Sequence, residues 1–252
     1  MQPDFSKIFH LSSKDHSKGH PPIPHEYEDW PQSWKTTFYK TYTRFPSIPL
    51  GDTPKSSFFG KQRAGLLDMI ERRRSQREFA DAALSKHELS ILLKYSCGNI
   101  GPLQGERHRR AQPSGGGRFP IEVYPVIFRS SPEIPAGLYH YNVRDHALDT
   151  LWEREFNEQD IDGLFTYPWV KHASMAFIMT AVFERNQVKY GERGYRYVLL
   201  EAGHIGQNAY LVSEALGIKC CALTGTRDEA LETLIDIDGT TESLIYALAV
   251  GK

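Results

Sequence analysis

The sequence predicts an α+β fold in which a sheet is flanked by helices. The chain has 252 residues, 40% of them hydrophobic and 24% charged, which is enough to bury one core without disulfides or a structural metal. From residue 61 onward, strand-like and helix-like segments alternate without an internal repeat. Residues 1–60 differ, because they are rich in Pro, His, Ser and Lys. We therefore expect an N-terminal extension over 1–60 and a single domain over 61–252.

The extension is expected to pack against other parts of the protein. Prolines in the segment 20–24 and at positions 46, 49 and 54 predict extended backbone there. Its aromatic side chains are too numerous for a free linker, so part of it should pack on the body or on a partner subunit. These side chains are Tyr27, Trp30, Trp34, Phe38, Tyr39 and Tyr42.

Two helices are predicted at the start of the domain. Leucines and an isoleucine over 66–70 share one helical face, and this helix runs into the arginines at 72–74. Ser85 and Glu88 have the spacing of a capping box, which predicts the start of a second helix. That helix should end before a glycine- and arginine-rich loop over 98–119.

The rest of the domain alternates between the two types of element. The continuous apolarity of 173–183 predicts a buried strand, and Pro125 predicts an edge position or a bulge for its own strand. The predicted strands are 121–128, 137–141, 147–152, 173–183, 220–224 and 243–250. The predicted helices lie near 157–165 and over 197–216 and 228–235.

Composition narrows the classes of function. Net charge is −1, yet residues 61–120 carry 12 basic and 6 acidic side chains, which suits a phosphate-bearing ligand. A solvated charged helix is an alternative, and nucleic acid, indicated by the cluster 107–110, is disfavoured by the overall balance. Three cysteines without a CxxC motif fit a reducing cytosol. No apolar run has the length of a membrane span or a signal peptide, so we expect a cytoplasmic protein.

Two segments have the composition of a site for a flat, phosphorylated ligand. The arginines and serine over 72–77 can bind phosphate, although a basic helix end that interacts with its own dipole fits equally well. Three consecutive glycines within 110–120 let a flat ligand approach the backbone, and a flexible surface loop is the alternative. Neither GxGxxG nor GxxxxGK[ST] occurs in the chain.

Lys189 and Tyr190 form a candidate proton-handling pair. A nearby ammonium lowers the pKa of a phenol, and the resulting phenolate supports the ammonium. The ordinary alternative is a lysine that extends to the surface beside a half-buried ring.

The predicted helix over 197–216 carries two stripes. Small residues at 202, 206 and 209 form a smooth stripe where another backbone can approach. Glu201, His204 and Asn208 form a polar stripe that needs partners, either across a subunit interface or in a ligand. No His or Glu lies four residues from His204, so no metal site is expected.

In their order and spacing, these segments resemble the nitroreductase-like flavoprotein superfamily, and within it the SagB-type dehydrogenases that aromatise azolines in ribosomal peptides. The resemblance extends from about residue 66 to the C-terminus. The matching motifs are Arg73-Arg-Ser-Gln-Arg-Glu-Phe79, Pro113-Ser-Gly-Gly-Gly117, Gly137-Leu-Tyr-His-Tyr141, Lys189-Tyr-Gly-Glu-Arg-Gly-Tyr-Arg196 and Glu201-Ala-Gly-His-Ile-Gly-Gln-Asn208.

This resemblance implies a nitroreductase-like α+β fold with a mixed, mostly antiparallel sheet, in an intertwined homodimer that binds FMN at the subunit interface. It implies that Lys189 and Tyr190 are the catalytic pair. The residues implied to hold the phosphate and the flavin edge are Arg73, Arg74, Ser75 and Arg77. Those implied to line the isoalloxazine ring are Pro113, Ser114, Gly115 and Gly116, and those near flavin N5 are Thr224 and Gly225.

The function that the resemblance implies is oxidation of thiazoline or oxazoline rings to thiazole or oxazole in a peptide or peptide-like natural product. A cyclodehydratase is a possible partner. Two other functions stay open from the residues alone. One is an NAD(P)H-dependent reductase of nitroaromatics or quinones, and the other is a non-catalytic scaffold subunit of a peptide-modifying complex.

Overall fold

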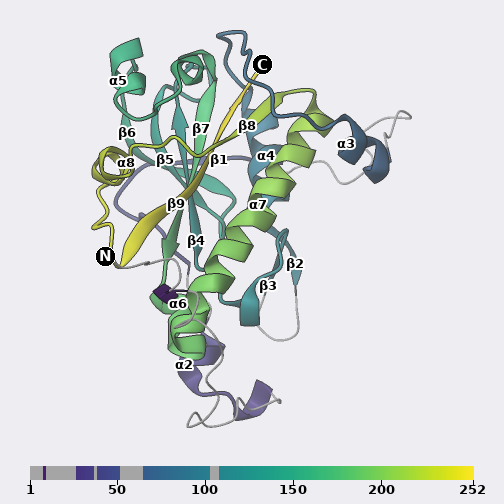
Figure 1. The fold of residues 1–252 in the computed structure, drawn as a ribbon, viewed down its shortest axis with the longest axis vertical. Helices are drawn as coiled ribbons and strands as arrows, with labels where there is room; N and C mark the ends of the chain where they lie inside the picture. The colour runs from purple at the N-terminus through teal and green to yellow at the C-terminus, as the bar shows by residue number, and fades with distance from the viewer. Residues whose placement is uncertain (1–7, 10–26, 37–38, 52–64, 103–107) are drawn as a thin grey trace.

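The computed structural model describes residues 8–9, 27–36, 39–51, 65–102 and 108–252. Within these residues the main sheet has seven strands in the order β1-β6-β5-β4-β7-β9-β8, and each pair of neighbours is antiparallel (Figure 1). The predicted α+β class, with a mostly antiparallel sheet flanked by helices, is confirmed. The strands are β1 (Ser47–Pro49), β4 (Ile121–Ile127), β5 (Gly137–Asn142), β6 (Ala147–Glu153), β7 (Met175–Val182), β8 (Lys219–Leu223) and β9 (Glu242–Gly251).

Helices contribute to a core on each face of this sheet. The long helix α7 (Gly194–Leu216) packs against α4 (Lys86–Cys97) and with it forms the first core. Helices α5 (Glu158–Asp162) and α8 (Asp228–Ile235) contribute to the second. The shorter helices are η1 (Tyr27–Asp29), α2 (Gln32–Lys35), α3 (Leu66–Arg72), η2 (Gly115–Gly117), η3 (Pro168–His172), α6 (Glu184–Tyr190) and η4 (Gly191–Arg193).

Strand β7 confirms the predicted buried strand and shows why it is apolar throughout. Met175 and Phe177 belong to the first core, whereas Ala176 and Ile178 belong to the second. Successive side chains of a strand point to opposite faces of the sheet. A strand that is covered on both faces must therefore be apolar at nearly every position.

The ends of the two packed helices follow their sequence signals. The Ser85 hydroxyl accepts a hydrogen bond from the Glu88 backbone N–H at 3.2 Å, and the Glu88 carboxylate accepts one from the Ser85 N–H at 2.8 Å. This is the predicted capping box at the start of α4. Helix α7 ends at Gly217, which has the left-handed φ of +68° that glycine adopts without strain.

Two local predictions were wrong. Pro125 lies in a central strand, because β4 is between β5 and β7, and it faces Phe177 in regular register. The ladder between β4 and β5 is confined to Val126 and Ile127, so Pro125 is not required to donate a hydrogen bond on that side.

The predicted loop over 98–119 contains a β-hairpin of β2 (Asn99–Pro102) and β3 (His108–Arg110). Residues 103–107 lie outside the described residues, including part of the cluster considered for nucleic acid.

The described parts of the predicted extension contact the body at several places. Strand β1 pairs with β6 at the edge of the main sheet. Lys40 forms an ion pair with Glu242 of β9, and its amine donates to Tyr124 Oη at 2.6 Å. The segment Trp30 to Thr36 lies against α6 and the glycine loop. Phe38, counted among the extension's aromatic residues, lies outside the described residues.

In the described parts of the chain, every helix is too short or too polar to serve as a membrane span.

Candidate functional site

The glycine loop and the Lys189–Tyr190 pair, which are more than 70 residues apart in sequence, meet in the structure. Helix α6 carries Lys189 and Tyr190 in its last turn. Gly116 of η2 has a φ of +65°, and a Cβ built on it would lie 2.4 Å from Tyr190 Oη and 3.3 Å from Lys189 Nζ. Only glycine allows this backbone to lie so close to both side chains. The Lys189 and Tyr190 side chains and the glycine loop therefore form one site.

Backbone and side-chain hydrogen bonds shape this loop. The Ser114 hydroxyl accepts a hydrogen bond from the Phe119 N–H at 2.9 Å, and its carbonyl accepts one from the Gly117 N–H at 3.0 Å. A Cβ on Gly115 would lie 3.4 Å from Tyr197 of α7, which is an ordinary contact. Pro113 is exposed at the start of the loop. Ser114 through Gly116 thus form a compact turn over the start of α7.

A buried carboxyl lies beneath the loop. Glu201 of α7 is 1% exposed, and Gln112 Nε2 donates to its Oε1 at 3.1 Å. Burial raises the pKa of Glu201 to about 7, although hydrogen bonds from Ser114 and Gln112 act in the opposite direction. Among the described residues, Glu201 Oε2 and Gln112 Oε1 have no hydrogen-bond partner.

Lys189 is enclosed by rings rather than by carboxylates. Its ammonium nitrogen lies 3.1 Å from the centroid of Trp30, 5.1 Å from that of Trp34 and 5.4 Å from that of Tyr190. Burial, with the positive charge of Arg118, lowers the pKa of Lys189 to about 8. Burial also raises the pKa of Tyr190. Both shifts have the same cause, because desolvation disfavours the charged form of the amine and of the phenol.

The predicted phosphate-binding arginines lie elsewhere, beside β8. The Arg73 guanidinium lies 5.3 Å from the centroid of Tyr210, whose hydroxyl is 3.0 Å from Ser75 Oγ. Arg74 donates to backbone carbonyls of its own segment, and Arg77 lies 3.5 Å from the Ser75 carbonyl. In the described part of the chain, no carboxylate is within ion-pair distance of these three guanidinium groups, which leaves them available to an anion.

Thr224 and Gly225 directly follow β8. Tyr167 Oη is 3.1 Å from Thr224 Oγ1, and the Thr166 N–H donates to the Gly225 carbonyl at 2.8 Å. A Cβ on Gly225 would come within 2.0 Å of Thr166 Oγ1, so this position also requires glycine. Because the Gln76 N–H donates to the Cys220 carbonyl of β8, the arginine segment runs alongside the strand that leads to Thr224.

The two groups of residues lie at opposite ends of α7. Tyr197 contacts the glycine loop and Tyr210 contacts the arginine segment. Thirteen residues separate them on one helix, which corresponds to about 20 Å. Figure 1 shows α7 running from α6 at one end to α3 and β8 at the other. A single chain therefore does not unite all of the predicted site residues in one place.

The small stripe of α7 faces inward, whereas the polar stripe is divided, because Glu201 is buried and His204 is exposed. Ala202, Gly206 and Ala209 are buried within their own chain, and a Cβ on Gly206 would lie 2.7 Å from the Tyr246 ring. On the polar stripe, Asn208 donates to the Ser96 carbonyl at 3.1 Å, while Glu201 binds Gln112 as described above. Glu201 and Asn208 thus have partners in the same chain, because α7 packs against α4 and the sheet.

Two residues of this site were not singled out by sequence reasoning. Arg118 is buried beside Lys189 and Tyr190, and Trp30 comes from the extension. A basic residue directly after three glycines was a usable signal for Arg118. No local pattern could have placed Trp30, because its contact spans about 160 positions of the chain.

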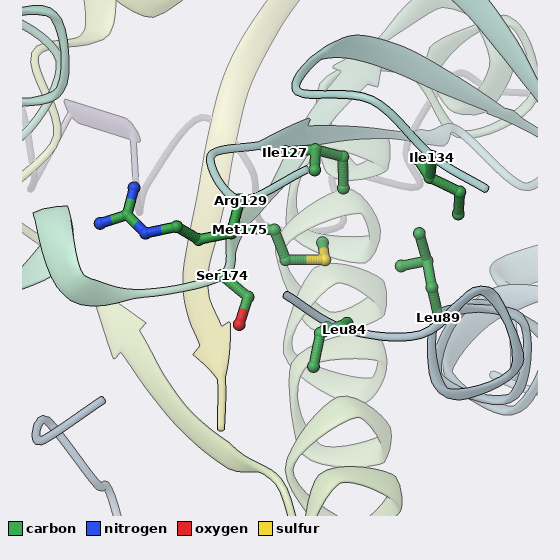
Figure 2. A pocket seen from close by; sticks show the side chains of 7 residues that line it. All are labelled: Leu84, Leu89, Ile127, Arg129, Ile134, Ser174 and Met175. Carbon is green, nitrogen blue, oxygen red and sulfur yellow. The ribbon is translucent and has the colours of Figure 1, made fainter. Parts of the chain in front are cut away.

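Figure 2 shows a separate, small pocket between α4 and the sheet. Leu84, Leu89 and Ile134 converge on it, and the Arg129 side chain extends away from them. None of the predicted site residues lines this pocket, which is a hollow in the core. Within the described residues, no three His, Cys, Asp or Glu side chains are grouped to hold a metal ion.

The family model described as "Nitroreductase family" matches residues 70–252. The chain belongs to the nitroreductase family. This confirms the resemblance drawn from the motifs and agrees with the sheet and helices described above. The matched range contains the arginine segment, the glycine loop and the Lys189–Tyr190 pair, and it excludes the whole extension.

Relatives with known assignments include two processing proteins. The trifolitoxin-processing protein TfxB of Rhizobium leguminosarum bv. trifolii is 33% identical over 177 residues, which is 67% of this chain and 48% of that protein. The microcin B17-processing protein McbC of Escherichia coli is 29% identical over 143 residues, 53% of this chain and 50% of that protein. The nitroreductase-family chain thus spans about half the length of these two relatives.

Solved structures share the fold. The Escherichia coli microcin synthetase McbBCD complex with truncated pro-MccB17 contains a chain that matches with a TM-score of 0.63 and 23% identity, covering 98% of this chain and 91% of that one. A structure from Exiguobacterium sibiricum in complex with FMN matches with a TM-score of 0.52 and 12% identity, covering 76% and 90%. At these identities the matches show the nitroreductase fold and no more.

Proposed function

We propose that this nitroreductase-family protein is an FMN-dependent dehydrogenase that oxidises thiazoline or oxazoline rings to thiazole or oxazole in a peptide or peptide-like natural product. The observation that carries the proposal is the enclosed Lys189 amine beside Tyr190 and Gly116. A lysine whose pKa is lowered to about 8 is a competent proton acceptor near neutral pH. The relationship to two processing proteins supports the choice of substrate class.

The residues present fit a flavin mononucleotide. Arg73, Arg74 and Arg77 have no carboxylate partner among the described residues, so they can bind a phosphate. The backbone of Gly116 and Gly117 is exposed at the other group of residues, where a planar ring can lie against it. A structural neighbour in complex with FMN supports the same cofactor.

Because these two groups of residues lie about 20 Å apart on α7, we infer a homodimer in which one subunit's arginine segment approaches its partner's glycine loop. Exposed apolar side chains support such an interface. Leu66 and Leu67 of α3 are 65% and 74% exposed, and Leu200 of α7 is 60% exposed. Patches of this kind mark protein–protein contacts when they are contiguous.

In this mechanism, FMN when bound supplies the acceptor for the hydride. The neutral Lys189 amine accepts the proton from the ring carbon, and the hydride leaves from the neighbouring carbon. Two hydrogens are removed in total, and the azoline becomes an aromatic azole. Tyr190, a neutral phenol, donates a hydrogen bond that orients the ring. Gly116 leaves room for the substrate beside both groups, and Trp30 excludes water from the amine.

The proposed setting is a peptide-processing complex in the cytoplasm, with a cyclodehydratase as the partner that makes the azoline. The match to a chain of the McbBCD complex supports the partner. The three cysteines are free and buried, as expected in a reducing compartment.

The test is anaerobic reduction of the purified, FMN-loaded protein, followed by the flavin absorbance. A thiazoline- or oxazoline-containing peptide should bleach the flavin and yield the azole, whereas NADPH should bleach it slowly. Rapid bleaching by NADPH without bleaching by any azoline would instead establish the reductase. A colourless protein that cannot be loaded with FMN would establish the scaffold.

A further inference from the structure

Arg118 is a buried guanidinium held by backbone carbonyls. The residue is 3% exposed. Its Nε donates to the Arg185 carbonyl at 2.7 Å, and its Nη1 donates to the Trp34 carbonyl at 2.7 Å and the Thr36 carbonyl at 3.3 Å. Among the residues that the structure describes, no carboxylate lies within ion-pair distance of it. Buried arginines are normally paired with a carboxylate. The positive charge of Arg118 is instead stabilised by the dipoles of backbone carbonyls.

The guanidinium joins three elements at the Lys189 amine. Arg118 follows the glycine loop, and Arg185 lies one helical turn before Lys189 on α6. Trp34 and Thr36 belong to the same short stretch as Trp30, whose ring covers the amine. Removing this side chain would release all three carbonyls at once.

We propose that Arg118 is a positioning residue of the Lys189–Tyr190 pair, fastening the segment Trp30–Thr36 over the Lys189 amine and placing an unneutralised positive charge beside both side chains. The chemical role of this arrangement rests on the function proposed above. A lysine accepts a proton only as the neutral amine, and a neighbouring positive charge disfavours its protonated form.

Other charges around the amine do not perform this role. The charged and titratable groups on η1, α2, α6, η4 and the first two turns of α7, together with Arg118, are Glu28, Asp29, Lys35, Glu184, Arg185, Tyr190, Glu192, Arg193, Tyr195, Arg196, Tyr197 and Glu201. Arg185 is neutralised by Glu122 at 2.5 Å, and Lys35 donates to the Glu28 carbonyl. Arg193 donates to Tyr197 Oη at 3.0 Å. Of these charges, that of Arg118 lowers the pKa of Lys189. The face of the Trp30 ring has the opposite effect, because it favours an ammonium.

The experiment measures the protonation of Lys189 directly. The protein is labelled with ¹³C-lysine, and the Cε resonance of Lys189 is assigned by its absence from Lys189→Arg. We expect a midpoint near pH 8 in the wild-type protein. In Arg118→Gln, the midpoint should rise by about one pH unit. At pH 8 the neutral fraction would then fall about fivefold.

Hydrogen exchange measured by mass spectrometry tests the second half of the proposal. Peptides that contain Trp30–Thr36 should exchange faster in Arg118→Gln than in the wild-type protein. Arg118→Lys keeps the charge and loses the planar fork. In Arg118→Lys, peptides that contain Trp30–Thr36 should therefore exchange as fast as in Arg118→Gln, while the midpoint of the Lys189 titration stays near pH 8. If Arg118→Gln does not fold, as judged by circular dichroism, the two readouts on Arg118→Lys decide the question.

Arg129→Gln is the matched control, because Arg129 also donates to backbone carbonyls, those of Phe128 and Lys171, but lies beyond the other end of β4. It should change neither readout. A wild-type midpoint in Arg118→Gln, or unchanged exchange of Trp30–Thr36 in Arg118→Lys, would overturn the proposal. Both measurements need neither FMN nor substrate, so failure to oxidise azolines would remove the proposed function and leave this result intact.

Discussion

The residues at the two ends of α7 differ in how completely a single chain encloses them. At the first end, Lys189 is 8% exposed and is enclosed by the glycine loop, Tyr190 and a tryptophan. At the second end, Arg74 and Arg77 are exposed, and their charges are unpaired among the described residues. The enclosed end has the side chains of the proposed proton-handling pair together, whereas the open end presents exposed charges that we propose a ligand and a second subunit cover.

This difference predicts that variants at the two ends will affect different quantities. Changes at the enclosed end should alter turnover and pH dependence while the flavin stays bound. Changes at the open end should alter flavin affinity while the turnover of the loaded protein stays nearly constant. A variant that alters turnover and flavin affinity equally would contradict this separation of roles between the two ends.

The largest effect is expected for Lys189→Ala. Loss of a general base costs about a hundredfold to ten-thousandfold in turnover. Azoline oxidation should fall by such a factor, and the protein should remain yellow and dimeric, as measured by absorbance and light scattering. In the wild-type protein, turnover should rise with pH through about 8, as Lys189 loses its proton. Turnover that survives in both Lys189→Ala and Tyr190→Phe would make the pair structural.

The second prediction concerns Glu201 beneath the same loop. Its pKa is about 7 in the folded protein against a usual value of 4.5, so the folded state retains a proton between these pH values and the unfolded state does not. The contribution of Glu201 to stability should be greatest below pH 4.5 and fall as pH rises to 7, by on the order of 3 kcal/mol. Glu201→Gln should lack this part of the decrease in urea denaturation. Parallel pH profiles for the two proteins would contradict a buried, protonated Glu201.

Regular elements and their order were predictable from sequence because their signals are local. Alternation of hydrophobic side chains and the capping box at Ser85 predicted the strands and α4. The continuous apolarity of β7 predicted burial on both faces. Motif order assigned Gly116 and Lys189 to one predicted site, and the structure brings them together although their contact is long-range.

The features that the sequence did not predict depend on which elements pack together in the folded chain. The small stripe on α7 predicted the close approach of another backbone, because the pattern does not reveal that the ring of Tyr246 fills the space beside Gly206. Pro125 was placed at an edge because the strand order is set by distant pairings. The lowered pKa of Lys189 depends on burial and on the charge of Arg118, and local sequence does not show that Trp30 and Arg118 lie beside the amine.

The third prediction addresses the open end. Arg73→Gln should weaken FMN binding by about tenfold to thirtyfold, because it removes one charged hydrogen-bond partner from the phosphate. Turnover of the protein at saturating FMN should change little. The neighbouring Arg72→Gln is the control, because Arg72 lies 3.8 Å from Glu214 and is outside the predicted set. Equal losses of FMN affinity in both variants would show that general positive charge, rather than Arg73, holds the phosphate.

The smallest effect separates backbone strain from contact within the glycine loop. Gly116 and Gly117 have nearly equal φ values of +65° and +64°, so alanine at either position should cost about 1–2 kcal/mol of stability. A Cβ on Gly117 meets nothing within 4 Å, whereas one on Gly116 collides with Tyr190 Oη. Thermal unfolding should therefore show the strain loss in both variants and a further loss in Gly116→Ala, and only Gly116→Ala should lose most of its turnover. If Gly117→Ala lost as much activity, the conformation of the loop, and not its contact with Tyr190, would be what the enclosed end requires.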